Sequence, residues 1–474
     1  MIMPINSFEN YPMSWKPDKT HLTSPLYLSI ATLLEYDIIN GTLAPQTKLP
    51  PQRELADFLD INLSTITRAF KICELKGLIY ANTGKGTFVS PSATLPNVLT
   101  NHETPLDYIE LGIIKPFYQL NSAVLATAKS VLNKKYAETL LEYSDPLGTV
   151  FQKQAAQKWL SRFQLNVPAD NIAITSGAQN ALTITLISLF QPGDKIVTDL
   201  YTHPNFKNLA NLLNIQLIPV AGDEFGMSPD GLDTVCKLNN IKGIYLMPTY
   251  SNPTNITISM ERRRSLAAII KKHELTLIED DVYAFLAPPE FIPITALIPE
   301  QSIYICGTSK SLCAGLRVAF IAFPSFCRSR IISGIYNINL KTPSLNTEIV
   351  AELIHRGSAD KFIEKKIALV KERNCIFNQY FPASESSDHM LSFFQWLPLP
   401  KHLDGNQFEK LAKSQGVHVF CSDRFAVGNT QQGAFVRLAI SSPTDSVELK
   451  KGLEIIKNLM QEKIRQTSST EFIV

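Results

Sequence analysis

The 474-residue sequence lacks the features that mark several classes of protein. No apolar run approaches the roughly 20 residues that a membrane-spanning helix needs. The amino-terminal residues do not join a basic segment to an apolar one, so we expect no secretory signal. The seven cysteines are scattered and contain no C-x-x-C pair, which argues against a disulfide framework or a zinc site. These absences favour a cytoplasmic protein and predict no metal site.

The sequence also lacks an excess of charge of either sign. The 45 lysines and arginines nearly balance 43 aspartates and glutamates, which leaves a formal net charge of +2. Any contact with nucleic acid must therefore come from local placement of charge and not from a polycationic body. The length exceeds what one hydrophobic core usually fills, so we expect one small and one large domain.

Residues 25–90 carry the pattern of three short helices followed by a hairpin. Apolar residues at helical spacing predict a first helix from Pro25 to about Asn40. Pro50 and Pro51 then begin a second helix, and Asn62 can cap a third. One face of the third helix is apolar and the other is polar, and residues 77–89 predict a hairpin. One side of this unit can pack while the other touches a partner.

The run Leu49-Pro50-Pro51-Gln52-Arg53-Glu54-Leu55-Ala56, with the later Gly77-Leu78-Ile79 and Gly84-Lys85-Gly86-Thr87-Phe88-Val89, resembles the DNA-binding domain of the GntR regulators. The resemblance implies a winged helix-turn-helix in which Arg53 holds a phosphate and the wing approaches the minor groove. The residues expected at double-stranded DNA are Arg53, Asn62, Ser64, Thr65, Arg68, Thr83 and Gly84. For Arg68, a merely solvated charge is an equal alternative.

Two positions of the third helix depart from the family pattern. Leu63 and Thr67 stand where many members carry arginines that read guanine, so the sequence preference cannot be transferred. Residues 25–90 also contain six Lys or Arg and six Asp or Glu. One module alone should bind DNA weakly, and we expect a homodimer that brings enough phosphate contacts together.

The rest of the chain predicts a linker and a large α/β domain. Three prolines and little periodicity mark residues 91–107 as a linker between a domain at 22–90 and one at 108–465. From residue 170 onward, seven short apolar runs alternate with helical stretches: 171–175, 195–198, 215–220, 243–247, 275–278, 303–305 and 318–323. This alternation predicts a mostly parallel seven-stranded sheet, with a large subdomain at about 108–345 and a smaller α/β subdomain at about 346–465.

Polar residues follow the predicted strands where each one ends. Lys310 lies in a small, glycine-bearing stretch after the strand at 302–306, with Arg317 seven residues on. An amine in such a place can hold pyridoxal phosphate as a Schiff base. Asp280 ends another strand, and Tyr283 follows three residues later. The turn Ser176-Gly177-Ala178 begins a helix and exposes backbone N–H groups that suit a phosphate.

Together these residues resemble the fold-type I, class I/II aminotransferases, and the order of the domains resembles the MocR subgroup of the GntR regulators. The resemblance implies Lys310 as the Schiff-base lysine, Asp280 as the partner of the pyridine nitrogen, and Arg437 as the binder of a substrate carboxylate. It assigns catalysis to Lys310, Asp280 and Tyr283. The residues it implies around the cofactor are Lys310, Asp280, Tyr283, Asn252, Tyr201, Gly177, Ala178, Ser309, Arg317 and, from a neighbouring subunit, Tyr143.

The chemistry of the cofactor explains these residue types. A carboxylate beside the ring nitrogen keeps it protonated, so that the ring withdraws electrons from the amino acid Cα. A lysine amine can move the Cα proton as general base and acid. An arginine binds a carboxylate through two parallel hydrogen bonds and so orients the Cα–H bond.

Three further positions depart from the family pattern. Gly307 replaces a serine that often serves the phosphate. Asn255 replaces the glycine of N-P-T-G, and Gln46 replaces a glycine before the Leu-Pro pair. We expect the phosphate to be held more loosely, or by backbone.

The residues leave more than one function open. We favour a transcription regulator that senses an amino acid or amine through the cofactor, because a DNA reader has no use in transamination. The alternative is an active aminotransferase with an ancillary DNA-binding module. A third interpretation keeps the fold as a ligand-binding scaffold without a cofactor. The sequence does not reveal the effector, the operator or the sign of regulation.

Overall fold

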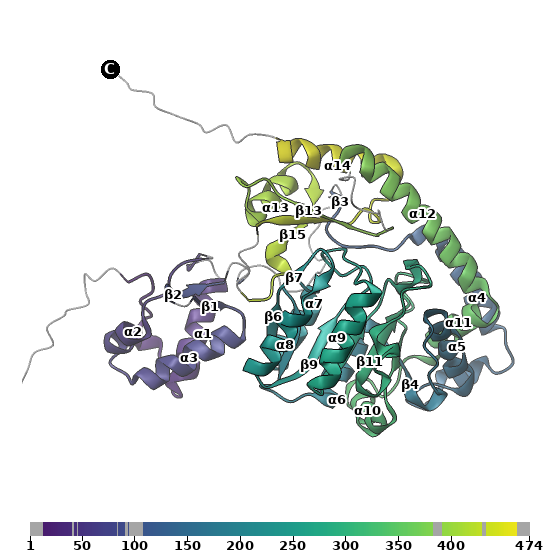
Figure 1. The fold of residues 1–474 in the computed structure, drawn as a ribbon, viewed down its shortest axis with the longest axis horizontal. Coiled ribbons are helices and arrows are strands. Elements are labelled where there is room, and N and C mark those ends of the chain that lie inside the picture. Colours follow the sequence, from purple (N-terminus) through teal and green to yellow (C-terminus); the bar gives the residue numbers. More distant parts are fainter. Residues whose placement is uncertain are drawn as a thin grey trace, which may run out of the picture.

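A computed structural model describes residues 13–39, 42–44, 46–82, 84–90, 93, 108–382, 391–428 and 433–461. Thr83 of the predicted wing lies outside these residues, as does the predicted linker apart from Ala93. Figure 1 shows three units, which are a small helical domain, a large α/β body and a smaller carboxy-terminal unit of sheet and helices.

The small domain is the expected winged helix-turn-helix. Its elements are α1 (Leu26–Ile39), α2 (Gln52–Leu59), α3 (Leu63–Leu75), β1 (Ile79–Asn82) and β2 (Gly86–Val89). Asn62 caps α3, since its side-chain oxygen accepts a hydrogen bond from Ser64 N at 2.9 Å. Ile66, Phe70 and Cys73 are buried on the inner face of α3, which confirms the apolar face that the sequence predicts.

The large domain contains the predicted seven-stranded sheet. Its order is β4-β12-β11-β10-β9-β5-β6, and β12 is antiparallel to both of its neighbours. The strands are β4 (Ile172–Thr175), β5 (Lys195–Asp199), β6 (Gln216–Val220), β9 (Ile241–Leu246), β10 (Thr276–Asp280), β11 (Ser302–Gly307) and β12 (Ala319–Ala322). A two-residue hairpin pair, β7 (Gly222–Asp223) and β8 (Gly226–Met227), stands apart from this sheet. The mixed, mostly parallel sheet confirms the predicted fold class.

Helices cover both faces of the large sheet, as Figure 1 shows. They are α4 (Asn121–Leu132), α5 (Val150–Leu160), α6 (Ala178–Leu189), α7 (Pro204–Leu212), α8 (Pro229–Leu238), α9 (Met260–Lys272), α10 (Arg328–Ile338), α11 (Ser344–His355) and α12 (Ser358–Tyr380). The long helix α12 runs from the large domain to the carboxy-terminal subdomain. Within the described ranges, no helix has both the length and the apolar character that crossing a bilayer requires.

The carboxy-terminal subdomain is built on a three-stranded sheet of β13 (Gln395–Pro398), β16 (Phe435–Leu438) and β15 (Phe420–Cys421), with helices α13 (Gly405–Ser414) and α14 (Ser446–Gln461). A short strand from far away in the chain, β3 (Ile109–Glu110), pairs in parallel with β14 (Val417–His418). The sequence places β3 in the large subdomain. Ile109 and Leu111 instead bury their side chains in the core of the smaller one, because Gly452 of α14 leaves room for them.

Two positions without glycine keep the backbone that glycine favours. Gln46 has a φ of 66° and Asn255 a φ of 61°, and both stand where the family pattern has glycine. Positive φ costs a residue with a Cβ about 1 kcal/mol or more, least for asparagine. Gln46 and Asn255 therefore adopt the left-handed backbone conformation that glycine favours, although neither is a glycine.

The loop between β9 and α9 is held by a buried arginine. Arg263 is fully buried and donates through its side chain to the carbonyl oxygens of Ile258, Ile292 and Pro248 at 2.8, 2.9 and 2.9 Å. Each of these bonds satisfies a polar group that folding removes from water. Arg263 thus fixes the loop that carries Asn252.

We expect Arg263→Met to lower the free energy of unfolding by about 3 kcal/mol, because it leaves buried carbonyl groups without donors. The measurement is urea unfolding followed by tryptophan fluorescence. Arg264→Met is the matched control, since Arg264 is exposed on the same helix and should leave the midpoint unchanged. Equal midpoints for the two variants would contradict the role of Arg263.

Candidate functional site

Three loops meet at the carboxyl edge of the large sheet. The strands β9, β10 and β11 are parallel neighbours, with β10 in the middle. The loop after β9 carries Asn252, β10 ends at Asp280, and the turn after β11 carries Lys310. Because parallel strands end at the same edge, the topology brings these three residues to one place.

Asp280 is a buried carboxylate whose two oxygens differ in their hydrogen bonding. Its Oδ2 accepts a hydrogen bond from the Tyr245 hydroxyl at 2.9 Å, and its buried Oδ1 has no partner among the described residues. Burial raises the pKa of Asp280 to about 6, and the Tyr245 hydrogen bond opposes that shift. An oxygen in this state suits a ring N–H donor. Sequence reasoning missed Tyr245, which lies on the neighbouring strand β9 and becomes adjacent only through the strand order.

Tyr283 lies 3% exposed near Asp280 and Arg437, both of which act on its titration. Burial raises the pKa of its hydroxyl, so Tyr283 is a neutral hydrogen-bond donor at neutral pH. Tyr201 follows β5 and is also buried. Two residues further on, burial and the charges of Arg437 and Lys310 lower the pKa of His203 to about 3. Sequence reasoning did not select this neutral imidazole.

Lys310 is partly buried on the turn after β11, and its Nζ donates to the carbonyl oxygen of Ile114. Burial, together with the charges of Lys366, Arg437 and Arg317, lowers the pKa of Lys310 to about 7. Its amine is therefore neutral above that pH and able to act as a nucleophile.

A second lysine positions the turn that carries Lys310. Lys366 of α12 is fully buried and its Nζ donates to the carbonyl oxygens of Lys310 at 2.7 Å and Leu312 at 2.9 Å. Lys366 is a positioning residue, because it fixes the backbone from which the Lys310 side chain projects. It lies 56 residues away in the sequence, where helical spacing alone gave no reason to select it.

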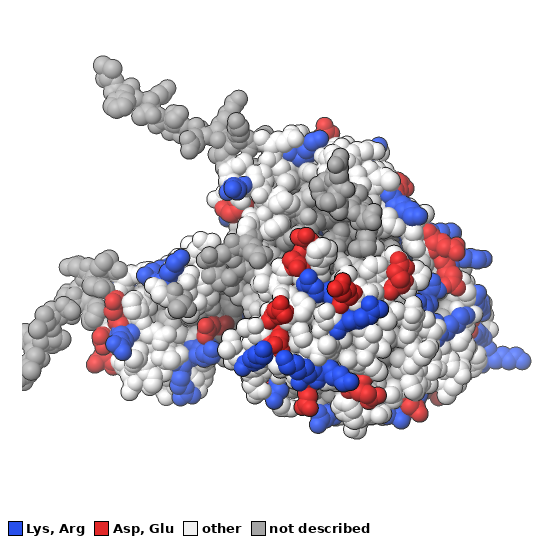
Figure 2. All heavy atoms as spheres, in the orientation of Figure 1, with Lys and Arg blue, Asp and Glu red and all other residues white. Residues whose placement is uncertain are grey.

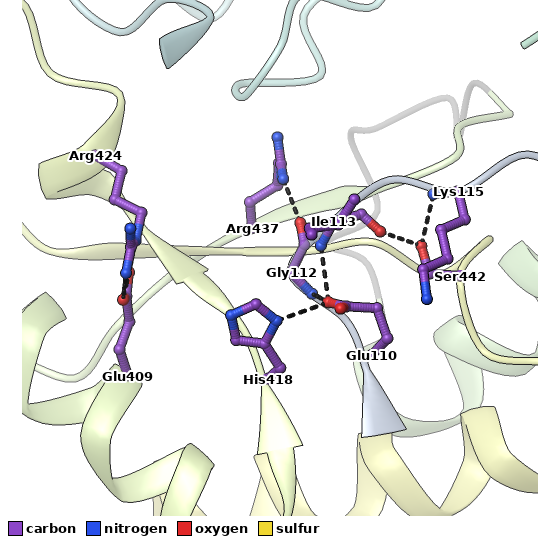
Figure 3. Close-up of polar contacts among 9 residues, drawn as sticks. All are labelled: Glu110, Gly112, Ile113, Lys115, Glu409, His418, Arg424, Arg437 and Ser442. Carbon is purple, nitrogen blue, oxygen red and sulfur yellow. Dashed lines mark hydrogen bonds and ion pairs between the residues drawn. The ribbon is translucent and has the colours of Figure 1, made fainter. Parts of the chain in front are cut away.

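Arg437 lies fully buried in β16. Its guanidinium group contacts Asn252 and the segment 112–115. Its Nη1 donates to Asn252 Oδ1 at 2.7 Å and its Nη2 to the carbonyl oxygen of Gly112 (Figure 3). Its Nε has no partner within the described part of the chain. Burial lowers the pKa of Arg437 only to about 10, so it remains a cation at neutral pH. A cation with a free donor could bind an anion.

The segment that contacts Arg437 is itself fixed by polar groups, as Figure 3 shows. Glu110 Oε1 accepts from Gly112 N and Ile113 N at 2.8 Å each, and His418 Nδ1 lies 3.0 Å from the same oxygen. Burial alone would raise the pKa of Glu110, but the hydrogen bonds from His418 and the two amides bring it below its usual value. Ser442 adds a hydrogen bond from Lys115 N at 2.9 Å. None of these contacts was predicted from the sequence.

The expected phosphate site lies at the start of α6. Gly177 has a φ of 89°, and a Cβ built on it would lie 2.5 Å from Nη2 of Arg317. Glycine is therefore required for the guanidinium group to approach the helix end. Ala178 is the first residue of α6, and Ser309 precedes Lys310. Gly307 stands where the family pattern has a serine, and a Cβ built on it would lie 3.4 Å from the Cβ of Ala178. An anion bound here would be left to backbone N–H groups and Arg317.

These residues fit pyridoxal phosphate. Lys310 would bind its carbonyl carbon, the unpartnered Oδ1 of Asp280 would face its ring nitrogen, and the start of α6 with Arg317 would hold its phosphate. Tyr283 and Asn252 would lie beside the ring oxygen, and Tyr201 beside the ring. When bound, the group supplies an electron sink for the bonds at the amino acid Cα.

The remaining predicted residues lie elsewhere. Tyr143 is 87% exposed and does not reach the site of its own chain. The candidate DNA contacts Arg53, Ser64 and Gly84 are exposed on the small domain, where Thr65 is half-buried. Arg68 lies over the ring of Tyr27 at 4.0 Å, and Asn62 serves as the cap of α3. On the face drawn in Figure 2, basic and acidic side chains are interspersed over both domains.

Comparison with known proteins identifies both parts of the chain. The family "Aminotransferase class I and II" matches residues 107–456, and "Bacterial regulatory proteins, gntR family" matches residues 26–89. The uncharacterized HTH-type transcriptional regulator YdeF of Bacillus subtilis is 40% identical over 97% of this chain and 100% of its own length. The HTH-type transcriptional regulator NorG of Staphylococcus aureus is 24% identical over 75% of this chain and 87% of its own length.

Solved structures resemble the large domain. An archaeal alanine:glyoxylate aminotransferase has a TM-score of 0.71 and 26% identity, and the match covers 76% of this chain and 92% of that one. The kynurenine aminotransferase of Pyrococcus horikoshii has a TM-score of 0.69 and 23% identity over 76% and 92% of the two chains. The fold and the family together make the large domain a pyridoxal phosphate domain. The chain therefore belongs to the aminotransferase class I and II family and, through its gntR-type amino-terminal domain, to the DNA-binding transcription regulators of the MocR type.

Proposed function

We propose that this regulator senses an amino acid or amine at the cofactor site and converts its binding into a change in affinity for double-stranded DNA. The observation that carries this proposal is that two groups lie together at the site. Arg437 is buried and its hydrogen bonds are incomplete, and the amine of Lys310 is partly neutral. Both groups await a small ligand that brings a carboxylate and an amine. The same chain contains a winged helix-turn-helix, so ligand binding has a DNA-binding domain on which it can act.

The residues of the site divide the work. Arg437 would bind the ligand carboxylate in place of the Gly112 carbonyl, and Asn252 would keep the guanidinium group oriented. Lys310 would give up its contact with Ile114 when its amine binds the cofactor. Both exchanges release the segment 112–115, which joins the carboxy-terminal subdomain to the large one. The ligand thus favours a different placement of that segment.

One contact offers a route from this site to the DNA reader. Helix α7 begins at Pro204, directly after Tyr201 and His203, and its Asn211 donates to the carbonyl oxygen of Lys76 at 3.1 Å. Lys76 is the residue that ends α3, the candidate recognition helix. A groove of about 360 Å³ lies between the two domains at this point. A shift of α7 would therefore move the end of α3.

We further propose that the chain works as a cytoplasmic homodimer. Large apolar side chains are exposed along one stretch of the chain, at Leu125, Leu132, Leu141, Tyr143 and Val150. Burial of such a set against a second copy removes apolar surface from water. In that arrangement Tyr143 of one copy would reach the phosphate of the other. Two readers would also double the phosphate contacts of one nearly neutral module.

Transamination is the second candidate. The observation in its favour is that Lys310, Asp280, Tyr283 and Arg437 form a complete set, with a lysine whose pKa of about 7 suits proton transfer at neutral pH. Steady turnover of an amino acid with a 2-oxo acid, without retention of DNA, would establish the enzyme. A single half-reaction without turnover agrees with a sensor.

The rate at which pyridoxal phosphate attaches to the cofactor-free protein should depend on pH. The rate should fall about tenfold for each pH unit below 7 and level off above pH 7, because only the neutral Lys310 amine attacks a carbonyl group. Stopped-flow absorbance measures this rate. Lys310→Ala is the control and should show no band of lysine-bound cofactor at any pH. A band in that variant would refute the assignment.

Arg53→Ala should weaken binding to all DNA sequences alike and lower the slope of log affinity against log salt by about one unit. Arg53 is exposed at the start of α2, where it can meet a phosphate. Fluorescence anisotropy with a selected site and a random duplex tests this. Arg264→Ala, an exposed arginine of the large domain, should change neither quantity. Loss of affinity at one base position only would contradict the phosphate role.

Asn211→Ala should reduce the effect of an amino acid on DNA affinity by about fivefold, the worth of one hydrogen bond. The absorbance of the bound cofactor and its response to the amino acid should stay unchanged, because Asn211 lies at the far end of α7. Anisotropy titrations with and without ligand measure the effect. Asn337→Ala, exposed on α10, is the control. An unchanged response in Asn211→Ala would show that coupling runs elsewhere.

A further inference from the structure

The carboxy-terminal sheet has one face that differs sharply from the other. In the register of the three strands, Trp396 of β13 and Phe420 of β15 stand directly opposite Arg437 of β16. Residues opposite one another on neighbouring strands point to the same face, as do residues two apart on one strand. Phe435 therefore joins them. Val436 and Leu438 point the other way, into the core with α13 and α14.

Aromatic rings surround the guanidinium group on this face. The centroid of the Phe425 ring lies 4.7 Å from Arg437 Cζ, and those of Phe420 and Phe394 lie at 5.8 and 5.9 Å. These three rings are buried. The face thus offers a ligand one fixed positive charge in an apolar setting.

Two further rings remain partly exposed beside the cofactor site. Trp396 and Phe435 stack with centroids 5.2 Å apart and planes at 5°. Tyr201, which the proposed function places beside the cofactor ring, meets both of them edge-on, at 5.5 and 6.1 Å. The side chain of a ligand held between Lys310 and Arg437 would therefore lie against Trp396 and Phe435.

Among the residues that the structure describes, the second arginine beside these rings is already paired with a carboxylate. Arg424 also lies over the Phe420 ring, at 4.6 Å, but Glu409 holds it through Nε at 2.9 Å and Nη2 at 2.7 Å (Figure 3). This two-point pairing neutralises the charge of Arg424. A ligand with an acidic side chain would lose water at its second carboxylate and gain no partner.

From this arrangement we propose that the effector is an α-amino acid with a single carboxylate and a large apolar or aromatic side chain. The inference rests on the proposed function and narrows its ligand class. Its carboxylate pairs with Arg437, and its side chain packs on Trp396 and Phe435. Amines are disfavoured because they leave the buried Nε of Arg437 without an anion.

The test uses the full-length protein loaded with pyridoxal phosphate and reads ligand binding by cofactor absorbance and by titration calorimetry. Phenylalanine should bind about tenfold or more tighter than alanine, the gain expected for burying a large apolar side chain. It should also bind at least about tenfold tighter than 2-phenylethylamine, which has the same ring and no carboxylate. Glutamate should bind no better than alanine.

Variants then locate the effect. Trp396→Ala should lower the affinity for phenylalanine by about tenfold and leave that for alanine unchanged. Phe435→Leu carries the same test with a smaller loss, should Trp396→Ala fail to fold. Phe326→Ala is the control, because Phe326 is 67% exposed at a remote site in the short helix Ser325–Cys327. Both variants binding phenylalanine like the unaltered protein would overturn the proposal.

The panel separates this inference from the proposed function. Strongest binding by glutamate, aspartate or an amine would overturn the ligand class and keep the sensor. If no amino acid or amine changed either the absorbance or the heat, the sensing function itself would fail, and the ligand class with it.

Discussion

The site is organised by polar groups that folding buries without fully satisfying them. Within the described part of the chain, Asp280 keeps an oxygen without a partner, and Arg437, surrounded by phenylalanine rings, keeps an Nε without one. Burial of such groups costs free energy, and a native protein tolerates them where a ligand completes the set. These two incomplete groups and the Lys310 amine match the ring nitrogen, the carboxylate and the carbonyl carbon that a cofactor and an amino acid would bring.

The rest of the large domain keeps these groups in place against their tendency to reach water. Lys366 fixes the turn of Lys310, Tyr245 orients Asp280, and Arg263 fixes the loop of Asn252. Each of the three positioning residues is buried and bonded to backbone or carboxylate oxygen. The hydrogen bonds of these residues fix the geometry of the site. An arrangement that is already held by packing loses little entropy when a ligand binds.

Under the proposed function, the segment 112–115 has two arrangements, one without and one with a bound ligand. The carbonyl groups of Gly112 and Ile114 occupy Arg437 and Lys310, while Glu110, His418 and Ser442 hold the segment to the carboxy-terminal subdomain. In the proposed function, a ligand carboxylate that takes Arg437 from Gly112 would bias the segment away from this arrangement. Under the proposed function, such a ligand-dependent shift is what the DNA-binding domain would respond to.

The sequence by itself determined the two domains, the order of strands and helices along the chain, and the principal residues of the site. Apolar periodicity and glycine or proline signals are local, so the winged helix and the seven strands could be predicted from neighbouring residues alone. Lys310 and Asp280 could be selected because they stand in short motifs at strand ends, and the family resemblance pointed to Arg437. Only the tertiary structure decided which distant side chains serve them. Tyr245, Lys366, Glu110 and the pairing of β3 with β14 depend on strand order, register and packing between residues that lie far apart in the chain, and no local pattern encodes those distances.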